Sequence, residues 1–135
     1  MNALFYLLLA LACFYILFML MHRMQHGMLK AKMSPEGLLR DKPLAKLRIT
    51  VGMGGNVKDR KAIGGVILTK QHLAIHLMGR TFMMVERAKL ASTVEIRAVE
   101  GGVEVDLQHG RQDLPVHKVV FLVPDPEGWV ADLTR

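Results

Sequence analysis

The sequence predicts a mainly β protein, with a single N-terminal transmembrane helix followed by seven antiparallel strands and a closing C-terminal helix. Residues 3–21 form an apolar run without a charged side chain. About 20 apolar residues span a hydrocarbon core about 30 Å thick. After this run and its basic flank, apolar and polar residues alternate in short runs, as is typical of half-buried strands. We expect three parts: a transmembrane helix (1–22), a basic juxtamembrane helical linker (23–43) and a β-domain (44–135).

The apolar run has the features of a retained anchor. Residues 10–13 resemble a signal-peptide or lipoprotein cleavage box. Against cleavage, no Lys or Arg precedes the run and strong apolarity continues beyond the box. We therefore expect the helix to stay in the membrane, through the side chains of Leu4, Phe5, Leu8, Leu11, Tyr15 and Phe18.

The distribution of charge predicts the orientation of the anchor. Residues 22–61 hold ten basic and three acidic side chains, whereas residues 62–135 hold eight basic and nine acidic ones. By the positive-inside rule, the N-terminus lies outside a bacterial-type inner (cell) membrane and the β-domain is cytoplasmic. The only cysteine, Cys13, lies inside the apolar run, in agreement with a reducing compartment. The basic excess lies beside the membrane and not in the folded domain, which argues against nucleic-acid binding.

Residues 19–28 gather methionine and histidine side chains. Thioethers and imidazoles are ligands for Cu(I), and His22 and His26 share one face of a helix. Methionine also packs irregular helix contacts, and we adopt that interpretation, without a metal. The 34–36 segment predicts a second short helix, which Pro43 limits.

The β-domain is predicted from its alternation and its turns. Gly64 and Gly65 predict a bulge inside a strand. The 100–102 segment predicts a tight hairpin, and further turns are expected at 52–56, 78–81 and 109–113. We expect strands at residues 44–51, 63–69, 73–77, 82–85, 94–98, 103–108 and 116–123, and a helix from Asp125.

Short connections favour sequential antiparallel pairing of these strands. Seven twisted strands without a parallel crossover curl into a barrel or a sandwich. The last strand is denser in apolar residues than the others, so we expect it to lie inside the sheet. The C-terminal helix carries Trp129 and Leu133 on one face, and we expect this face to plug an open end of the fold.

One segment resembles a known family. Residues 65–75 (GVILTKQHLAI) are similar to the phrase G-x-L-x-L-T-x-x-R-L-x-F of bacterial PH-like and GRAM-like domains. The similarity covers roughly residues 44–133 and implies a seven-strand, half-open barrel capped by a C-terminal helix that often carries a tryptophan. His72 stands where the family usually has Arg, and the glycine pair also departs from the pattern.

A basic segment is the best candidate for binding. Lys58 and Arg60 resemble the K/R-x-R element with which lipid-binding PH domains bind inositol phosphates. Clustered cations and loop amides stabilise phosphate oxygens. The alternative is a solvated basic loop near anionic headgroups. The candidate lipid- or phosphate-binding residues are Lys46, Arg48, Lys58, Arg60 and Lys61.

No set of residues predicts catalysis or a metal site. His72 and His76 lie on one strand, about 13 Å apart, which is too far for one ion, so we expect both to face solvent. Neither of the two serines lies in a G-x-S-x-G elbow. The glycines at 52–55 match no nucleotide-binding fingerprint. We therefore expect no enzyme activity, no cofactor and no small-molecule substrate.

Two functions remain open at this point. The first is a non-enzymatic adaptor or binding module at the membrane surface, which binds protein or anionic lipid. The alternative is a small accessory or assembly subunit of a larger integral membrane complex, packing through its transmembrane helix. The expected partners are membrane lipids and, in the second case, an integral membrane protein.

Overall fold

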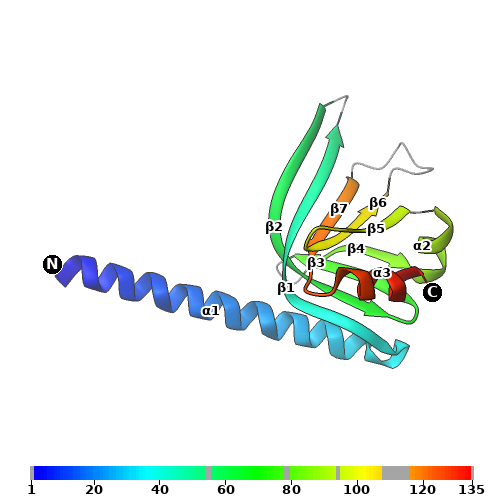
Figure 1. Cartoon of the computed structure of the whole chain (residues 1–135). Helices are drawn as coiled ribbons and strands as arrows, with labels where there is room; N and C mark the ends of the chain where they lie inside the picture. Colours follow the sequence, from blue (N-terminus) through cyan, green and yellow to red (C-terminus); the bar gives the residue numbers. More distant parts are fainter. Residues whose placement is uncertain (1, 54–55, 78–79, 94, 108–115, 135) are drawn as a thin grey trace.

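The computed structural model describes residues 2–53, 56–77, 80–93, 95–107 and 116–134. Helix α1 (Asn2–Met33) and a 3-10 turn, η1 (Ser34–Glu36), precede the sheet. The strands are β1 (Leu38–Met53), β2 (Asn56–Thr69), β3 (His72–Leu77), β4 (Arg80–Glu86), β5 (Glu95–Val99), β6 (Gly102–Asp106) and β7 (Val116–Leu122). The other helices are α2 (Arg87–Thr93) and α3 (Pro126–Thr134). Figure 1 confirms the predicted class, mainly β with a helix at each end.

The described strands form one seven-stranded antiparallel sheet in the order β4-β3-β2-β1-β7-β6-β5. Pairing is sequential within β1–β4 and within β5–β7, as the short connections predict. Pairing of β1 with β7 joins the two meanders and places β7 inside the sheet. Strands β4 and β5 are the two edges, so the sheet is half-open. Helix α2, which the sequence analysis missed, connects these edges and buries Leu90.

Helix α1 continues into the predicted helical linker, but it ends at Met33 and β1 begins earlier than the sequence analysis predicts. The helix runs through Gly27 to Met33, and β1 starts at Leu38. Packing of the last turns of α1 against the sheet offsets the cost of the glycine. Pro43 lies inside β1, where the register shifts between Lys42 and Ala45 and no ladder hydrogen bond is required of it. Helix α1 is long and apolar enough to cross a membrane.

The bulge is in a different strand from the one predicted. Between Lys42 and Ala45, strand β1 carries one more residue than the β2 segment from Gly64 to Val66 that it faces. The glycine pair therefore lies opposite the bulge. The predicted turns at residues 54–55, 78–79 and 109–113 lie outside the described residues.

The main core fills the inner face of the sheet and is closed by α3. The ring of Trp129 is buried and meets Phe121 edge-on, with the ring centroids 5.4 Å apart. Arg40 of β1 lies over the same indole and pairs with Asp132 of α3. The helix begins as predicted, because Asp125 Oδ1 accepts a hydrogen bond from the Gly128 amide at 3.2 Å. The predicted plug is thus confirmed as a helix that covers the core.

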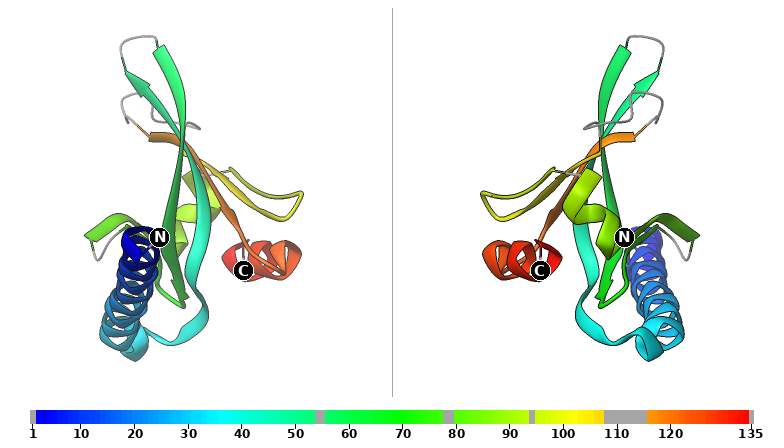
Figure 2. Two further views of the ribbon diagram at one scale, coloured as in Figure 1. Left: turned by 90° about the vertical axis from the view of Figure 1, so that its left-hand side faces the viewer. Right: turned by 90° about the vertical axis from the view of Figure 1, so that its right-hand side faces the viewer.

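The outer face of the sheet is divided into two parts. The last turns of α1 cover β2 and β3, with Met33, Ile67 and Ala74 buried between them. The outer face of β1, β7, β6 and β5 carries no helix among the described residues. Figure 2 shows α1 and α3 on opposite sides of the long β1–β2 hairpin.

Replacement of Trp129 by Ala tests the role of α3. We expect Trp129→Ala to lower the free energy of unfolding by about 3–5 kcal/mol, because a buried aromatic ring is lost from the core. Urea denaturation of the full chain in detergent measures this. Glu127→Ala, on the exposed side of the same helix, is expected to change stability by less than about 0.5 kcal/mol. Equal stability of the two variants would show that α3 does not close the core.

Candidate functional site

Two features of the outer face are candidates for function: a polar junction between α1 and the sheet, and a basic groove beside it. The junction begins at the end of the apolar run. His22 and His26 are buried although they lie on a helix that is otherwise mostly exposed. His22 Nε2 lies 2.9 Å from the carbonyl oxygen of Pro43, in the bulge of β1.

Three imidazole rings meet at this junction, which we call the histidine cluster (His22, His26 and His76). His26 Nδ1 lies 2.7 Å from His76 Nε2 of β3. On its other side, His26 Nε2 lies 3.1 Å from Asp41 Oδ2 of β1. The ring of His22 stacks on His76, with the centroids 5.6 Å apart. The cluster therefore joins α1, β1 and β3 through polar contacts.

The environment of His76 disfavours its charged form. The side chain is 1% exposed, and its Nδ1 atom has no hydrogen-bond partner among the described residues. Burial, and after it the positive charge that His26 and His22 can carry, lower the pKa of His76 to about 4. His76 is therefore neutral at pH 7.

Gly65 provides the space for the cluster. A Cβ atom at this position would lie 2.0 Å from His76 Nε2 and 2.5 Å from His26 Nδ1. Any side chain on Gly65 would overlap the bonded pair of rings. Gly65, one of the two glycines that were predicted to shape β2, thus lets side chains of α1 and β3 approach the backbone of β2.

The prediction that His72 and His76 face solvent is wrong for His76 and only partly right for His72. Both lie on the side of β3 that faces α1 and η1, and this side is covered. His72 is half-buried and its Nδ1 lies 2.9 Å from Glu36 Oε2. Thr69 donates a second hydrogen bond to Glu36 Oε2, at 2.8 Å.

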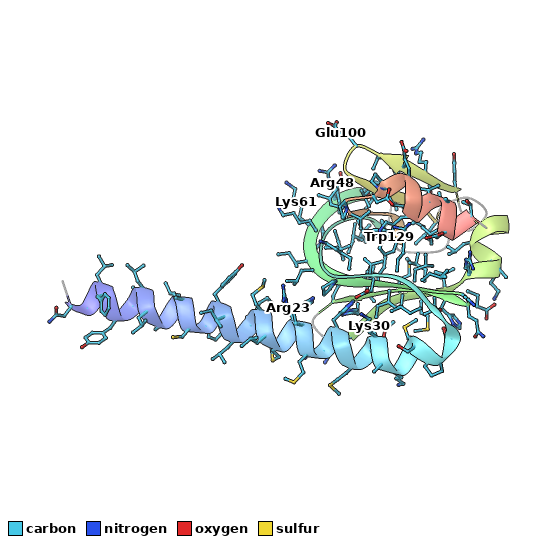
Figure 3. All side chains as sticks on the ribbon, turned by 60° about the horizontal axis from the view of Figure 1, so that its bottom comes forward. Arg23, Lys30, Arg48, Lys61, Glu100 and Trp129 are labelled. Atoms are coloured by element: carbon cyan, nitrogen blue, oxygen red, sulfur yellow. The ribbon has the colours of Figure 1, made fainter. Side chains whose placement is uncertain are left out.

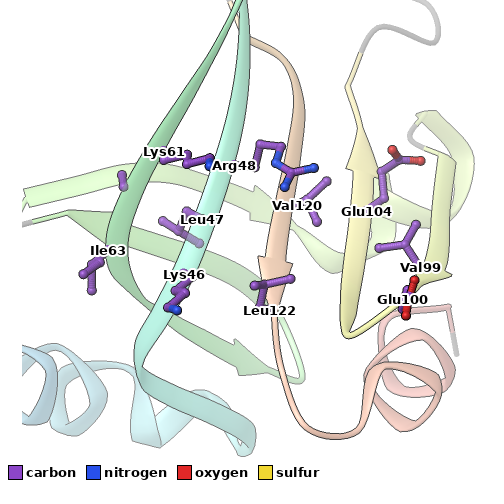
Figure 4. A pocket seen from close by; sticks show the side chains of 11 residues that line it. Lys46, Leu47, Arg48, Lys61, Ile63, Val99, Glu100, Glu104, Val120 and Leu122 are labelled. Atoms are coloured by element: carbon purple, nitrogen blue, oxygen red, sulfur yellow. The ribbon is translucent and has the colours of Figure 1, made fainter.

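The basic groove is a depression of about 890 Å³ on the uncovered part of the outer face. Figure 4 shows that its side chains come from β2, β1, β7, β6 and β5. Its cations are Lys46 and Arg48 of β1 and Lys61 of β2. Apolar side chains, including the exposed Ile63 and Leu122, lie between and beside them.

The five predicted binding residues are divided between the two faces of the hairpin. Lys58, Arg60 and Lys61 lie in strand β2 and not in a loop. Arg48 is paired directly with Lys61, and both line the groove. Arg60 is opposite Ile49, a core residue, so Arg60 and Lys58 project from the other face. The K/R-x-R resemblance therefore falls outside the groove.

The cations of the groove lack acidic partners. Within the described part of the chain, no carboxylate lies within ion-pair distance of Lys46, Arg48 or Lys61. Like charges directly opposite on neighbouring strands, as in Arg48 and Lys61, are destabilising. An anion bound between them would relieve that repulsion.

Two acids line the far side of the groove, Glu100 in the turn between β5 and β6 and Glu104 of β6, and Glu104 is neutralised locally. Glu104 of β6 pairs with Arg97 and with Lys118, whose Nζ lies 3.2 Å from Glu104 Oε1. Burial alone would raise the pKa of Glu104, but the hydrogen bonds from Arg97 and Lys118 lower it. Glu104 is ionised at pH 7 and does not offset the cations of β1 and β2.

The side chains predicted to face the membrane lie mostly on the exposed surface of α1. All of those predicted are exposed except Phe18, which is half-buried and stacks on His22 with the ring centroids 6.4 Å apart. Among the described residues, no group of three His, Cys, Asp or Glu side chains has the geometry of a metal site. In this structure the histidine cluster is held together by hydrogen bonds and ring stacking.

The two glycines of the junction provide a matched pair of variants. A Cβ atom on Gly65 would overlap two rings, whereas one on Gly27 meets nothing within 4 Å. We expect Gly65→Ala to weaken docking of α1 by about 1–3 kcal/mol, through overpacking. Amide hydrogen exchange in residues 22–33 of the full chain should then be at least about fivefold faster.

Gly27→Ala is expected to slow the same exchange slightly, because alanine favours the helix by about 0.5–1 kcal/mol. Unchanged exchange in Gly65→Ala would show that the rings do not need this space.

In comparisons with known proteins, the sequence matches no family model and no curated relative. The PH-like resemblance therefore stays a prediction.

Proposed function

We propose that this chain is a single-span membrane protein whose β-domain is a non-enzymatic binding module, with a groove that binds the headgroups of anionic lipids. The N-terminus lies outside and the domain is cytoplasmic, because the basic residues follow the span. The observation that carries the proposal is the position of three cations, without acidic partners among the described residues, on the side of the domain next to the anchor.

The first support is the closeness of the domain to the end of the span. Domain contacts begin at His22, directly after the apolar run, where its ring bonds to Pro43. A helix rises about 1.5 Å per residue, so the contact region of residues 22–33 is only about 17 Å long. An anchor whose apolar run fills the bilayer therefore holds the domain against the headgroup layer.

The second support is the direction in which the groove faces. Figure 3 shows Arg48 and Lys61 on the side of the domain from which the N-terminal half of α1 extends. The groove also adjoins the junction along β2, because Ile63 lines the groove and Gly65 lies under the histidine cluster. With α1 across the bilayer, these cations face the lipid surface.

The third support is chemical. Anionic headgroups present phosphate oxygens, which guanidinium and ammonium groups bind through charge-assisted hydrogen bonds. Each Lys or Arg near an anionic membrane contributes about 1 kcal/mol. The apolar Ile63 and Leu122 at the rim are exposed and suit the boundary between headgroups and acyl chains.

A headgroup-quenching experiment tests this proposal. A fluorophore is attached at Ile63→Cys in the full chain with Cys13→Ala, in nanodiscs whose lipid headgroups carry a nitroxide quencher. We expect stronger quenching with anionic than with neutral lipid, and a decrease at 0.5 M salt. Arg48→Glu with Lys61→Glu should weaken the preference for anionic lipid by at least about tenfold, from the loss of two contributions of about 1 kcal/mol.

The matched control is Lys58→Glu with Arg60→Glu, which changes the charge by the same amount on the opposite face of β2. It should retain most of the preference for anionic lipid. Equal losses in the two double variants would show that only net charge matters, and would contradict a groove-specific contact.

A further inference from the structure

The histidine cluster has a restricted capacity for protons. His26 and His76 together have four ring nitrogens. One proton lies in the bond between His26 Nδ1 and His76 Nε2, since a 2.7 Å separation admits only one. A second lies on His26 Nε2, which faces the carboxylate of Asp41 at 3.1 Å. These two protons make both rings neutral.

A third proton can bind to only one of the four ring nitrogens. The two nitrogens that face each other share a single proton, and His26 Nε2 already carries one. The remaining position is His76 Nδ1, which is buried and has no hydrogen-bond partner among the described residues. Every singly charged form of the pair therefore places an unsatisfied N–H group in the interior, which disfavours that form.

The surroundings of His76 do not compensate a positive charge on that ring. From α1, the groups that face the cluster are His22, His26 and Lys30, all neutral or positive. From β1, Asp41 is shared between His26 and Lys30, whose Nζ lies 3.4 Å from Asp41 Oδ2. From β2 the neighbour is Gly65, and from β4 the partner of His76 is Thr81, neither of which is charged.

The same bonds hold the helix on the sheet. His26 belongs to α1, and its two partners belong to β3 and β1. The other end of the contact is apolar, with Met33 buried against Ile67 and Ala74. Loss of the polar end leaves α1 held only near its last turn.

We propose that the histidine cluster is a proton-sensitive latch, in which uptake of one proton by the His26–His76 pair releases residues 22–28 of α1 from the sheet. This inference goes beyond lipid binding by the groove and does not depend on it. It concerns how rigidly the domain is held on its anchor.

The sign of the pH dependence follows from the two states. In the docked state the pKa of His76 is about 4, below the ordinary value of 6.5 that it regains on release. Docking is therefore fully stabilised above pH 6.5 and weakens as the pH falls toward 4. Between pH 7.5 and pH 5 the docked-to-released ratio is expected to fall roughly thirtyfold.

The other histidine contact on β3 does not weaken in this range. Hydrogen bonds from His72 and Thr69 lower the pKa of Glu36, so its carboxylate stays charged at pH 5. Any release between pH 7.5 and pH 5 is therefore attributable to the cluster.

Spin-label distances in the full chain test the latch. Labels at Met28→Cys on α1 and Val57→Cys on β2 are both on exposed side chains, and Cys13→Ala removes the native thiol. In nanodiscs of neutral lipid we expect one narrow distance distribution at pH 7.5 and a broad one at pH 5. His76→Gln, whose amide donates to His26 Nδ1 but does not titrate, should stay narrow at both pH values.

The matched control is His117→Gln. His117 belongs to β7, and its ring lies beside Gly52, far from the histidine cluster along β1. This variant should broaden at pH 5 as the unmodified chain does. A distribution that is unchanged from pH 7.5 to pH 5 overturns the latch, and so does equal broadening in His76→Gln.

If His76→Gln does not dock even at pH 7.5, nitrogen NMR of the histidine rings in the unmodified chain decides the question. The latch requires a His76 ring protonated at Nε2 and bare at Nδ1 at pH 7.5, with a titration midpoint well below 6.5. A bare Nε2, or a midpoint near 6.5 while α1 remains docked, overturns it.

Discussion

The structure depends on the close approach of α1 to the backbone of β2 at Gly65. At this point the helix meets the sheet where β2 has no side chain, and the imidazole rings of His26 and His76 occupy the space. The bulge of β1 lies directly opposite and turns the carbonyl of Pro43 toward His22. Without this contact, α1 would be held on the sheet only through the apolar packing of its last turns and through η1. With it, the end of the span and the outer face of the sheet form one surface.

This junction also determines where the uncovered part of the sheet lies. Helix α1 covers the outer face of β2 and β3 and leaves that of β1, β7, β6 and β5 open. Strand β1 contributes residues to the contact with α1, to the core and to the groove. Asp41 contacts the helix, Leu47 and Ile49 enter the core, and Arg48 lines the groove. The alternation of a single long strand thus connects anchor, core and binding face.

Much of the fold was predictable, because hydrophobic alternation and turn residues report directly on a sheet with one buried face. The start of α3 at the Asp125–Pro126 pair and its inward Trp129 followed from local rules. The extra residue in β1 did not, because a bulge depends on which strands pair. Helix α2 was missed because Leu90 is the only buried side chain described on it, too little for a periodic signal.

The candidate site was harder to predict than the fold. Lys46, Arg48 and Lys61 were among the residues selected by charge, but strand pairing was needed to show that these three line one groove and that Lys58 and Arg60 do not. His22 and His26 were recognised as sharing a helix face, but hydropathy gives no reason to bury them. The available signal for His76 was its small neighbours: Ala74 lies two residues before it on the same face, and Gly65 pairs with it across the strands.

Under the proposed topology, in which α1 spans the bilayer and the groove binds headgroups, the unbroken course of α1 has a mechanical consequence. The apolar run and residues 22–33 form one continuous helix. The β-domain packed on its end is too polar to enter the hydrocarbon. The helix therefore cannot slide along its axis to match the thickness of the bilayer. A change in thickness must instead be met by tilt. Tilt moves the β-domain toward the headgroups on one side of the helix and away from them on the other. Through this geometry, the thickness of the surrounding membrane sets how deeply the basic face sits in it.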